Sequence, residues 1–322
     1  MDHKIYLTEP IEATAQERLR QAYPIDVGDL SLPVAEHRRR VADATVILSK
    51  SDPLRIGRDI MDAAPSLRHI ARHGTGYNNV DVAYATAKGV SISYVYGVNA
   101  VAVGEYTVGL MLLAARKLVS AVEKSRLGDP PRGQFLGVEL LGKTFGIIGV
   151  GRIGREVIQR VRAFGMQVLA YHPRPQGKDF SGLDMTLVSL DELLARSDVV
   201  SVHTPLTDET QNLIGARELS LMKPTAYFMN VGRGGIVDEV ALAEILRERR
   251  IAGAVLDVLA SEPVSANDPL FQYDNCIILP HIATMTAETQ ARTAMAAVEN
   301  ILSFCRGERP PYLANPEAWR PG

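Results

Sequence analysis

The stretch GIIGVGRIG, residues 146–154, decides how the chain is organised. Its glycines have the spacing G-x-G-x-x-G, which is typical of the turn between the first strand and the first helix of a dinucleotide-binding domain. An apolar run at 144–148 precedes the turn, and apolar side chains recur after it at helical spacing. In such a turn the first glycine permits a tight bend, the second lets a pyrophosphate approach the backbone, and the third lets the helix pack closely on the strand. The alternative is an ordinary strand–turn–helix corner.

Short apolar runs alternate with amphipathic segments on both sides of this turn, which predicts helices packed on parallel sheets. Before the turn we expect strands at 3–8, 24–28, 45–49, 69–72 and 90–94. From the turn onward we expect strands at 144–149, 167–171, 198–203, 226–231, 253–257 and 276–280. A long helix at about 101–126 separates the two series and is ended by the segment GDPPRG at 128–133. Ser189 and Glu192 have the spacing of a capping box for a short helix.

The glycine turn follows the first strand of the second series, so the nucleotide domain begins near residue 99 and not at residue 1. The segment after 285 is one helix, stopped by Gly307, and a proline-rich tail, which is too little to fold alone. We therefore expect an α/β protein with two doubly wound parallel-sheet domains and a cleft between them. A Rossmann dinucleotide-binding domain, 99–285, would be inserted in a flavodoxin-like substrate domain made of 1–98 plus 286–322.

Composition is ordinary for a globular protein, with 46% hydrophobic residues, 22% charged residues and a net charge of −2. This balance does not indicate a nucleic-acid partner, and we interpret the short basic run at 37–40 as the solvated face of a helix. Cys276 and Cys305 are too few for a disulfide framework and lack zinc-ligand spacing, so we expect no metal site. The chain has no pattern of a signal peptide and no apolar run of the roughly 20 residues that span a bilayer. We expect a cytoplasmic protein without a membrane partner.

Three later segments end predicted strands with reactive side chains: NVGRGG at 230–235, DVLASEP at 257–263 and LPHIA at 279–283. Open α/β sheets bind ligands outside the carboxyl ends of their strands, so an Arg, a Glu and a His should meet beside the nucleotide turn. Singly, Arg233 could be a surface ion pair, Glu262 a solvated turn residue and His281 a structural histidine. Their convergence favours an active site.

At this point the sequence resembles the D-isomer-specific 2-hydroxyacid dehydrogenase family, which includes phosphoglycerate, glycerate/hydroxypyruvate and formate dehydrogenases. The resemblance covers nearly the whole chain. Its motifs are HGTGYNNVD (73–81), NAVAVGEYTVGLML (99–112), GIIGVGRIG (146–154), VHTPLTDETQNLI (202–214), MNVGRGGIVDE (229–239), AGAVLDVLASEP (252–263) and ILPHIA (278–283).

The resemblance implies a division of labour among three side chains. His281 would be the general acid–base, because imidazole with a pKa of about 6.5 can gain and lose a proton near neutral pH. Glu262 would hydrogen-bond the other ring nitrogen, which fixes the tautomer and raises the histidine pKa. Arg233 would hold the carboxylate and carbonyl of the substrate through its planar fork. The remaining implied substrate contacts are the backbone of Gly74, Thr75 and Gly76, and the side chain of Asn99.

The resemblance also implies a set of cofactor contacts. They are Thr107, Gly149, Gly151, Arg152, Ile153, Gly154, His172, Pro173, Arg174, His203, Pro205, Thr210, Val231 and Asp257. Asp257 is expected to meet the carboxamide end of the cofactor.

One departure from the family pattern lies in VLAYHPRP at 168–175, where His172 stands in place of the aspartate of many NAD-using relatives. A carboxylate there accepts from both ribose hydroxyls and repels a 2′-phosphate, so its loss removes the discrimination against NADP. Arg174, two residues on, could pair with that phosphate. We therefore expect NADP(H) to be preferred. The alternative is that Arg174 is solvated and His172 packs against adenine, leaving NAD usable.

The expected activity is the reduction of small 2-keto acids, of the glyoxylate and hydroxypyruvate class, to D-2-hydroxy acids. A D-3-phosphoglycerate dehydrogenase is the alternative enzyme, for which Lys50 is a weak phosphate candidate. A non-catalytic, nucleotide-sensing protein resembling the corepressors of this family is the alternative from another class, although no charged interaction tail follows residue 307. The apolar helix at 101–126 lies where resembling proteins dimerise, so we expect a homodimer.

Overall fold

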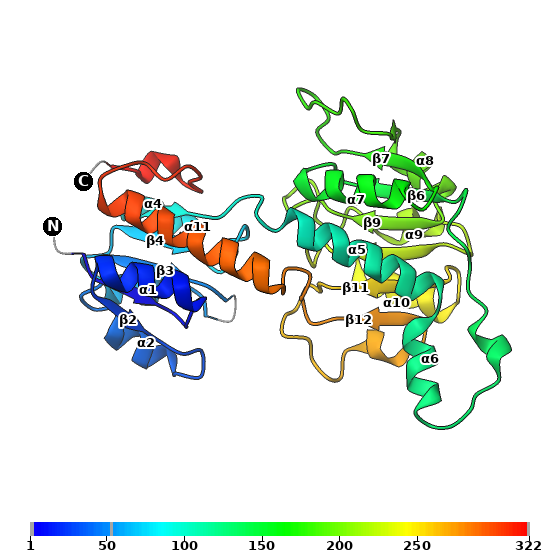
Figure 1. Ribbon diagram of the computed structural model, residues 1–322, viewed down its shortest axis with the longest axis horizontal. Helices are drawn as coiled ribbons and strands as arrows, with labels where there is room; N and C mark the ends of the chain where they lie inside the picture. Colours follow the sequence, from blue (N-terminus) through cyan, green and yellow to red (C-terminus); the bar gives the residue numbers. More distant parts are fainter. Residues whose placement is uncertain (1–2, 52–53, 321–322) are drawn as a thin grey trace. The chain divides into compact units, whose positions relative to one another are not determined.

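The computed structural model describes residues 3–51 and 54–320. The chain divides into two compact units. Unit 1 comprises Met1–Asn99 and Met285–Gly322, and unit 2 comprises Ala100–Thr284. Each unit contains one parallel sheet with helices on both faces (Figure 1).

The sheet of unit 1 has the strand order β2-β1-β3-β4-β5, which is the flavodoxin-like order that the sequence predicts. All described pairs of neighbouring strands are parallel. Its strands are β1 (Ile5–Leu7), β2 (Ile25–Val27), β3 (Val46–Ser49), β4 (His69–Arg72) and β5 (Ser91–Ser93). Each lies within the range that the apolar runs predict.

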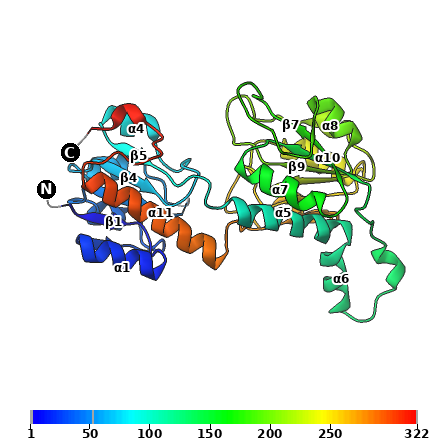
Figure 2. The ribbon, with the colours of Figure 1, turned by 45° about the horizontal axis from the view of Figure 1, so that its top comes forward.

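Alternate side chains of these strands enter two hydrophobic clusters, one on each face of the sheet. Val46 and Leu48 pack with α1 (Ala13–Ala22) and α11 (Ala287–Cys305). Ile47, between them, packs on the opposite face. The helices of that face are α2 (Val34–Arg40), α3 (Arg58–Ala63) and α4 (Val82–Ala87). The C-terminal helix α11 thus returns to the N-terminal segment and lies beside α1 (Figures 1 and 2).

Unit 2, all of whose residues are described, has a seven-stranded sheet with the order β12-β11-β10-β9-β6-β7-β8. The order reverses between β6 and β9, as in a Rossmann domain. Its strands are β6 (Thr144–Ile148), β7 (Gln167–Tyr171), β8 (Thr186–Leu187), β9 (Val199–Val202), β10 (Tyr227–Asn230), β11 (Gly253–Leu256) and β12 (Cys276–Ile278). The sequence predicts all of them except β8, which has two exposed residues and no apolar run.

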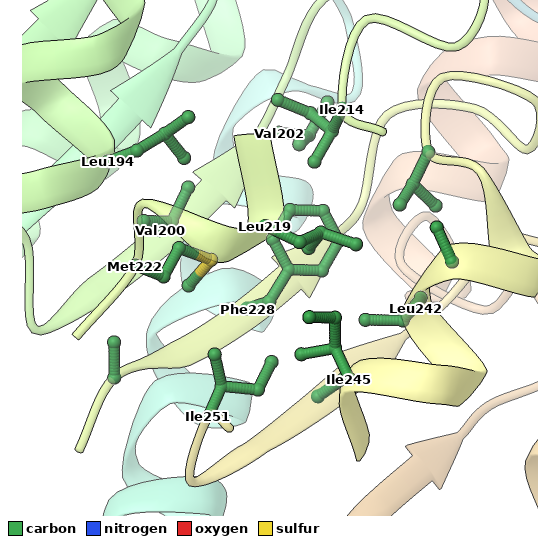
Figure 3. Packing of buried hydrophobic residues seen from close by; sticks show 14 of the residues in the cluster. Leu194, Val200, Val202, Ile214, Leu219, Met222, Phe228, Leu242, Ile245 and Ile251 are labelled. Atoms are coloured by element: carbon green, nitrogen blue, oxygen red, sulfur yellow. The ribbon is translucent and has the colours of Figure 1, made fainter. Parts of the chain in front are cut away.

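Both faces of this sheet are also covered. Met229 packs toward α5 (Ala100–Ala115) and α7 (Arg152–Arg162), while Phe228 points to the opposite face. Phe228 lies at the centre of the cluster in Figure 3. The helices on its side are α8 (Leu190–Arg196), α9 (Ala216–Ser220) and α10 (Glu239–Arg247). The short 3-10 helices of the chain are η1 (Arg132–Phe135), η2 (Pro269–Gln272) and η3 (Pro316–Ala318).

The long helix expected at 101–126 is wrong as a single element. The structure has two helices there, α5 and α6 (Leu118–Ser125), because Lys117 adopts a left-handed backbone conformation with φ +52°. A residue in that conformation cannot continue a right-handed helix. Gly104 lets α5 approach α7 closely, since a Cβ there would lie 2.7 Å from the Cβ of Glu156.

The basic run at 37–40 is only partly the solvated face that the sequence suggests. His37 is buried, and its Nδ1 is 2.6 Å from the hydroxyl of Tyr6. Arg40 forms an ion pair with Asp26. The reason is that α2 packs this side of its last turn against the sheet of unit 1.

The capping box at Ser189 forms only in part. Ser189 Oγ accepts the N–H of Glu192, as predicted, but the Glu192 carboxylate pairs with Arg196. Among the described residues, no helix is long and apolar enough to cross a bilayer. Nor do residues 3–51 and 54–320 contain a group of three or more His, Cys, Asp or Glu side chains that could hold a metal ion.

Candidate active site

The three reactive side chains of the sequence follow three neighbouring strands. Arg233 follows β10, Glu262 follows β11 and His281 follows β12, and these strands are adjacent in the sheet of unit 2. Nδ1 of His281 is 2.7 Å from Oε2 of Glu262. A carboxylate can only accept, so Nδ1 carries the hydrogen and Nε2 is the nitrogen that exchanges a proton. The structure therefore brings the predicted acid–base pair together.

Two hydrogen bonds and one close backbone contact hold the loop that carries Glu262. Glu262 Oε1 accepts the N–H of Leu259 at 3.2 Å within the loop. Oε1 of Glu239, at the start of α10, accepts the N–H of Ala260 at 2.7 Å. Gly234 permits the loop after β10 to touch it, since a Cβ at that position would overlap the carbonyl of Leu259. These contacts fix the carboxylate that faces His281.

The electrostatics of the pair favour its charged form. The hydrogen bond that His281 donates to Glu262 raises the pKa of His281 above its ordinary value, against the opposing effects of burial and of the Arg233 charge. Burial alone would raise the pKa of Glu262, but the hydrogen bond and charge of His281 lower it below its usual range. Imidazolium and carboxylate thus stabilise each other in a half-buried setting.

Arg233 lies in a short turn that is held by its neighbours. The Asn230 side chain donates to the carbonyl of Arg233 at 2.9 Å and accepts the N–H of Gly232 at 3.1 Å. Nη1 of Arg233 donates to the carbonyl of Gly232 at 2.8 Å. The charge of Arg233 acts on both Glu262 and His281. A half-buried guanidinium in this place could bind a carboxylate.

The glycine turn has the geometry that a pyrophosphate requires. Gly149 has φ +98°, and a Cβ there would lie 2.8 Å from the backbone nitrogen of Thr204, on the loop after β9. A Cβ on Gly154 would lie 2.6 Å from the carbonyl oxygen of Gly149. By contrast, a Cβ on Gly151 would meet nothing within 4 Å. The described residues therefore fit a dinucleotide, because the open space at Gly151 lies at the N-terminus of α7, where backbone N–H groups favour an anion.

The segment after β7 holds the two residues expected to choose the cofactor. His172 Nδ1 accepts the backbone N–H of Arg174 at 3.1 Å, and burial lowers the pKa of this histidine. The Arg174 fork is held by Glu209, with Nε 2.7 Å from Oε2 and Nη2 2.6 Å from Oε1. Both side chains of this pair are more than half exposed. Pro173 is half-buried and Arg152 is exposed at the start of α7.

Thr107 and Thr210 are buried, and their hydroxyls serve the chain itself. Thr107 donates to Val103 within α5, and Thr210 donates to the carbonyl of Pro205. The structure gives these two residues a structural role, and their contact with a cofactor stays a prediction. His203 keeps some exposed surface, although Nδ1 is enclosed without a partner among the described residues and Nε2 lies 2.9 Å from Ser201 Oγ.

Pro205 is exposed, Ile153 is half-buried and Val231 is buried. Asp257 is also buried, at 1% exposure, and its carboxylate already accepts three hydrogen bonds. The hydroxyl of Tyr106 and the N–H of Ile282 donate to Oδ1, and the N–H of Ala283 donates to Oδ2. Asp257 therefore holds the loop after β12, a role that the sequence does not predict.

Unit 1 carries the glycine loop expected to bind an anion. The N–H of Gly74 donates to the carbonyl of Arg72, so it is not available for a ligand. Thr75 Oγ1 and the carbonyl of Gly74 bind the backbone of Val95. In the hydrogen bonds of the described residues, the backbone N–H groups of Thr75 and Gly76 are not used. Of the expected anion-binding nest, only the N–H groups of these two residues therefore remain available. Asn99 directly precedes α5 and is the last residue before unit 2.

Sequence reasoning missed four residues of the site: Tyr106, Glu209, Asn230 and Glu239. Asn230 alone had a local signal, because it directly precedes the VGRGG turn and asparagine side chains commonly bind nearby backbone in turns. The other three act on residues far away in the sequence.

The chain is similar to known proteins along nearly its whole length. Residues 108–283 match the family described as D-isomer specific 2-hydroxyacid dehydrogenase, NAD binding domain. A glyoxylate reductase from Aeropyrum pernix is 41% identical over 326 residues, covering 98% of this chain and 96% of the relative. A D-3-phosphoglycerate dehydrogenase from Methanocaldococcus jannaschii is 37% identical, covering 97% of this chain and 59% of the relative.

Among solved structures, an NADPH-dependent glyoxylate/hydroxypyruvate reductase from Sinorhizobium meliloti, in complex with NADP and malonate, has a TM-score of 0.83. It is 28% identical and covers 99% of both chains. The similarity thus extends over both units, and the range 108–283 that matches the family contains Arg233, Glu262 and His281.

Proposed function

We propose that this chain, which belongs to the D-isomer-specific 2-hydroxyacid dehydrogenase family, reduces small 2-keto acids of the glyoxylate and hydroxypyruvate class to D-2-hydroxy acids. The observation that carries the proposal is the hydrogen bond between His281 and Glu262 on the same sheet edge as the glycine turn. The names of the relatives support this substrate class.

The acid–base step follows from the ring geometry. A bound nicotinamide cofactor would supply the hydride. Nε2 of His281 would give its proton to the carbonyl oxygen, which gains the π electron pair as the carbonyl carbon is reduced. The histidine is then neutral, and Glu262 keeps the remaining hydrogen on Nδ1. In the reverse direction neutral His281 accepts the hydroxyl proton.

Arg233 is the residue that we assign to the substrate. Its guanidinium would bind the carboxylate and draw negative charge onto the carbonyl oxygen, which lowers the barrier to hydride transfer. The backbone N–H groups of Thr75 and Gly76, which have no partner in the hydrogen bonds of the described residues, stay proposed anion contacts. We also keep Asn99 as a proposed substrate contact.

We propose NADP(H) as the preferred cofactor. The absence of an acidic residue in 172–174 removes the repulsion of a 2′-phosphate, and Arg174 offers a positive charge there. The NADP complex of the reductase from Sinorhizobium meliloti supports this choice. Glu209 competes for the same guanidinium, so the preference depends on how easily that ion pair opens.

The competing activity is that of a D-3-phosphoglycerate dehydrogenase, since one relative at 37% identity has that name. A phosphorylated substrate would need a cation near the glycine loop. Lys50 directly follows the neighbouring strand β3, but its ammonium donates to the carbonyl of Pro10 at 2.8 Å and lies 3.5 Å from the Glu9 carboxylate. Its charge is thus already engaged, which favours an unphosphorylated substrate.

The experiment that tests the proposal is an oxidation screen with NADPH and NADH. The panel contains glyoxylate, hydroxypyruvate, pyruvate, a bulkier 2-keto acid and 3-phosphohydroxypyruvate. We expect the highest kcat/KM for the small unphosphorylated acids and a D-configured product from those that yield a chiral one. A preference for 3-phosphohydroxypyruvate would establish the competing activity. Cofactor binding without turnover of any panel member would favour a nucleotide-sensing protein.

We also propose a homodimer, formed by the C-terminal part of the 101–126 segment that the sequence suggests, which is α6, and by the segment after it. Most of α5 is buried within unit 2, whereas large apolar side chains are exposed on α6 and the segment after it. Leu127 is 90% exposed, Leu136 79% and Leu141 77%. Such exposure is typical of a protein interface. Light scattering should give twice the chain mass, and Leu136→Asp should shift it toward the monomer. A cytoplasmic location stays a prediction from the sequence.

A further inference from the structure

His281 has an unusual backbone conformation for a residue of its size. Its φ is +54°, in the left-handed region that residues with a Cβ seldom occupy. Strained residues persist only where the surrounding structure holds them, and they are common at active sites. The position of the ring, and therefore of Nε2, depends on whatever holds this backbone.

Asp257 holds the backbone that leaves His281. Its two carboxylate oxygens accept the N–H groups of the next two residues, Ile282 at 3.0 Å and Ala283 at 3.1 Å. Asp257 directly follows β11, is 1% exposed, and so is itself fixed. Glu262 binds the ring at Nδ1. Backbone and ring are thus held by two different carboxylates.

Tyr106 of α5 fixes Asp257 in turn. Its hydroxyl donates to Oδ1 at 2.8 Å, the same oxygen that accepts from Ile282. Burial, together with the bond to Asp257, raises the pKa of Tyr106 far above its ordinary value. The phenol therefore remains a donor at every pH at which the protein would work. One hydrogen bond links a helix on the face of the sheet to the catalytic loop.

We propose that Tyr106 is a positioning residue that acts through Asp257 to hold His281 in its left-handed conformation, with the ring aligned on Glu262. The inference rests on the proposed function, because it gives the alignment of His281 a purpose. The proposal adds Tyr106, which lies 175 positions before His281 in the sequence (281 − 106) and binds neither ring nitrogen of His281.

The competing explanation is that Tyr106 only packs α5 on the sheet, since its ring borders the hydrophobic cluster on that face. The two explanations differ in what the loss of the hydroxyl would do. Packing alone predicts that Tyr106→Phe leaves the site unchanged. Positioning predicts that His281 spends part of its time out of register with Glu262, so that its pKa and its rate of proton transfer both fall.

The charged groups that act on His281 are Glu262, Arg233 and Asp257. The hydrogen bond to Glu262 has the largest influence and raises the pKa of His281; the charge of Arg233 lowers this pKa, and the charge of Asp257 raises it least. A weaker hydrogen bond to Glu262 would therefore lower the pKa of His281 by more than a stronger effect of the Asp257 charge could raise it. The expected sign is a lower pKa of His281 in Tyr106→Phe.

The test compares Tyr106→Phe with Tyr227→Phe. Tyr227 begins β10 and borders the same cluster, but its hydroxyl has no hydrogen bond within unit 2, where every residue is described. In Tyr106→Phe we expect kcat for 2-keto acid reduction to fall about tenfold, with KM for the acid and the cofactor Kd changed less than about twofold. The basic limb of the kcat profile should move to lower pH, while Tyr227→Phe should match the wild type.

Two further measurements separate the possible failures. The pKa of His281 can be followed by NMR with 15N-labelled histidine, its signal being identified by its loss in His281→Gln, and this needs no turnover. We expect a drop of about half a unit in Tyr106→Phe, which is within the range of ordinary environmental shifts. In an Asp257→Asn background, Tyr106→Phe should cause little further loss of kcat, because both changes break the same chain of contacts.

The positioning role would be overturned by an unchanged His281 pKa in Tyr106→Phe. It would also be overturned if Tyr106→Phe lowered kcat equally in the wild type and in Asp257→Asn. An inactive wild type with the expected pKa shift would instead overturn the proposed function and leave the positioning role supported.

Discussion

His281 and Glu262 are joined by a 2.7 Å hydrogen bond between Nδ1 and Oε2, although the two residues follow different strands of the sheet. The bond fixes which nitrogen exchanges a proton and raises the pKa of the histidine. The pH dependence of the enzyme should therefore be controlled by the carboxylate.

Glu262→Gln should move the basic limb of kcat/KM for reduction to lower pH. Reduction needs protonated His281, and the raised pKa keeps that form populated to higher pH, where it is lost as pH rises through this pKa. Each unit of downward shift costs about tenfold in rate above the pKa. The profile is measured with saturating cofactor, and Glu248→Gln, at an exposed position directly after α10, serves as the control. An unmoved limb would mean that Glu262 does not set the pKa.

Arg233→Lys should lower kcat/KM for the keto acid by about a hundredfold, a loss typical of removing a charge-stabilising donor. Lysine keeps the charge but loses the planar fork. Because Arg233 follows β10 and the glycine turn follows β6, cofactor Kd should stay unchanged. Steady-state kinetics and fluorescence titration measure the two quantities, with Arg247→Lys as the control. Retained kcat/KM would remove Arg233 from substrate binding.

Glu209→Gln should lower KM for NADPH by about two- to fivefold, as expected for an exposed ion pair, and leave KM for NADH unchanged. The carboxylate occupies the fork of Arg174, so its neutralisation releases the guanidinium for a 2′-phosphate. The gain should vanish in an Arg174→Ala background, and Arg174→Ala alone should weaken NADPH selectively. A higher KM for NADPH in Glu209→Gln would show that the carboxylate orients the arginine instead.

Gly151→Ala and Gly154→Ala should fail in different ways. A methyl on Gly151 meets no protein atom within 4 Å, so Tm should be retained while cofactor affinity falls, because the methyl enters the space expected for the pyrophosphate. A methyl on Gly154 lies 2.6 Å from the Gly149 carbonyl oxygen and should cost about 1–3 kcal/mol of stability. Thermal unfolding and cofactor titration measure both variants. Unchanged affinity in Gly151→Ala would mean that the turn does not bind a phosphate.

The sequence predicts the sheets well because parallel strands that are buried on both faces consist of continuous apolar runs. It does not predict β8, whose two residues are exposed, or the break at Lys117, because no glycine or proline stands there. Both depend on contacts outside the local sequence.

The sequence could indicate that Arg233, Glu262 and His281 lie at one edge of the sheet because each follows a strand of a recognisable type. The pairs Tyr106–Asp257 and Arg174–Glu209 could not, since their partners lie far apart in the sequence and only folding joins them. Gly74 shows the same limit. A glycine in this loop suits an anion-binding nest, yet in the structure its N–H donates to the carbonyl of Arg72.

The most direct test of the account compares wild type and His281→Gln in NADPH and NADH oxidation with glyoxylate and hydroxypyruvate, while the cofactor Kd is measured in parallel. Glutamine can hydrogen-bond but cannot donate a proton at the required step. We predict turnover by the wild type, a loss of kcat of at least about a hundredfold in the variant, and an unchanged cofactor Kd. Turnover by His281→Gln at a rate near that of the wild type would contradict the assignment of His281 as the acid–base.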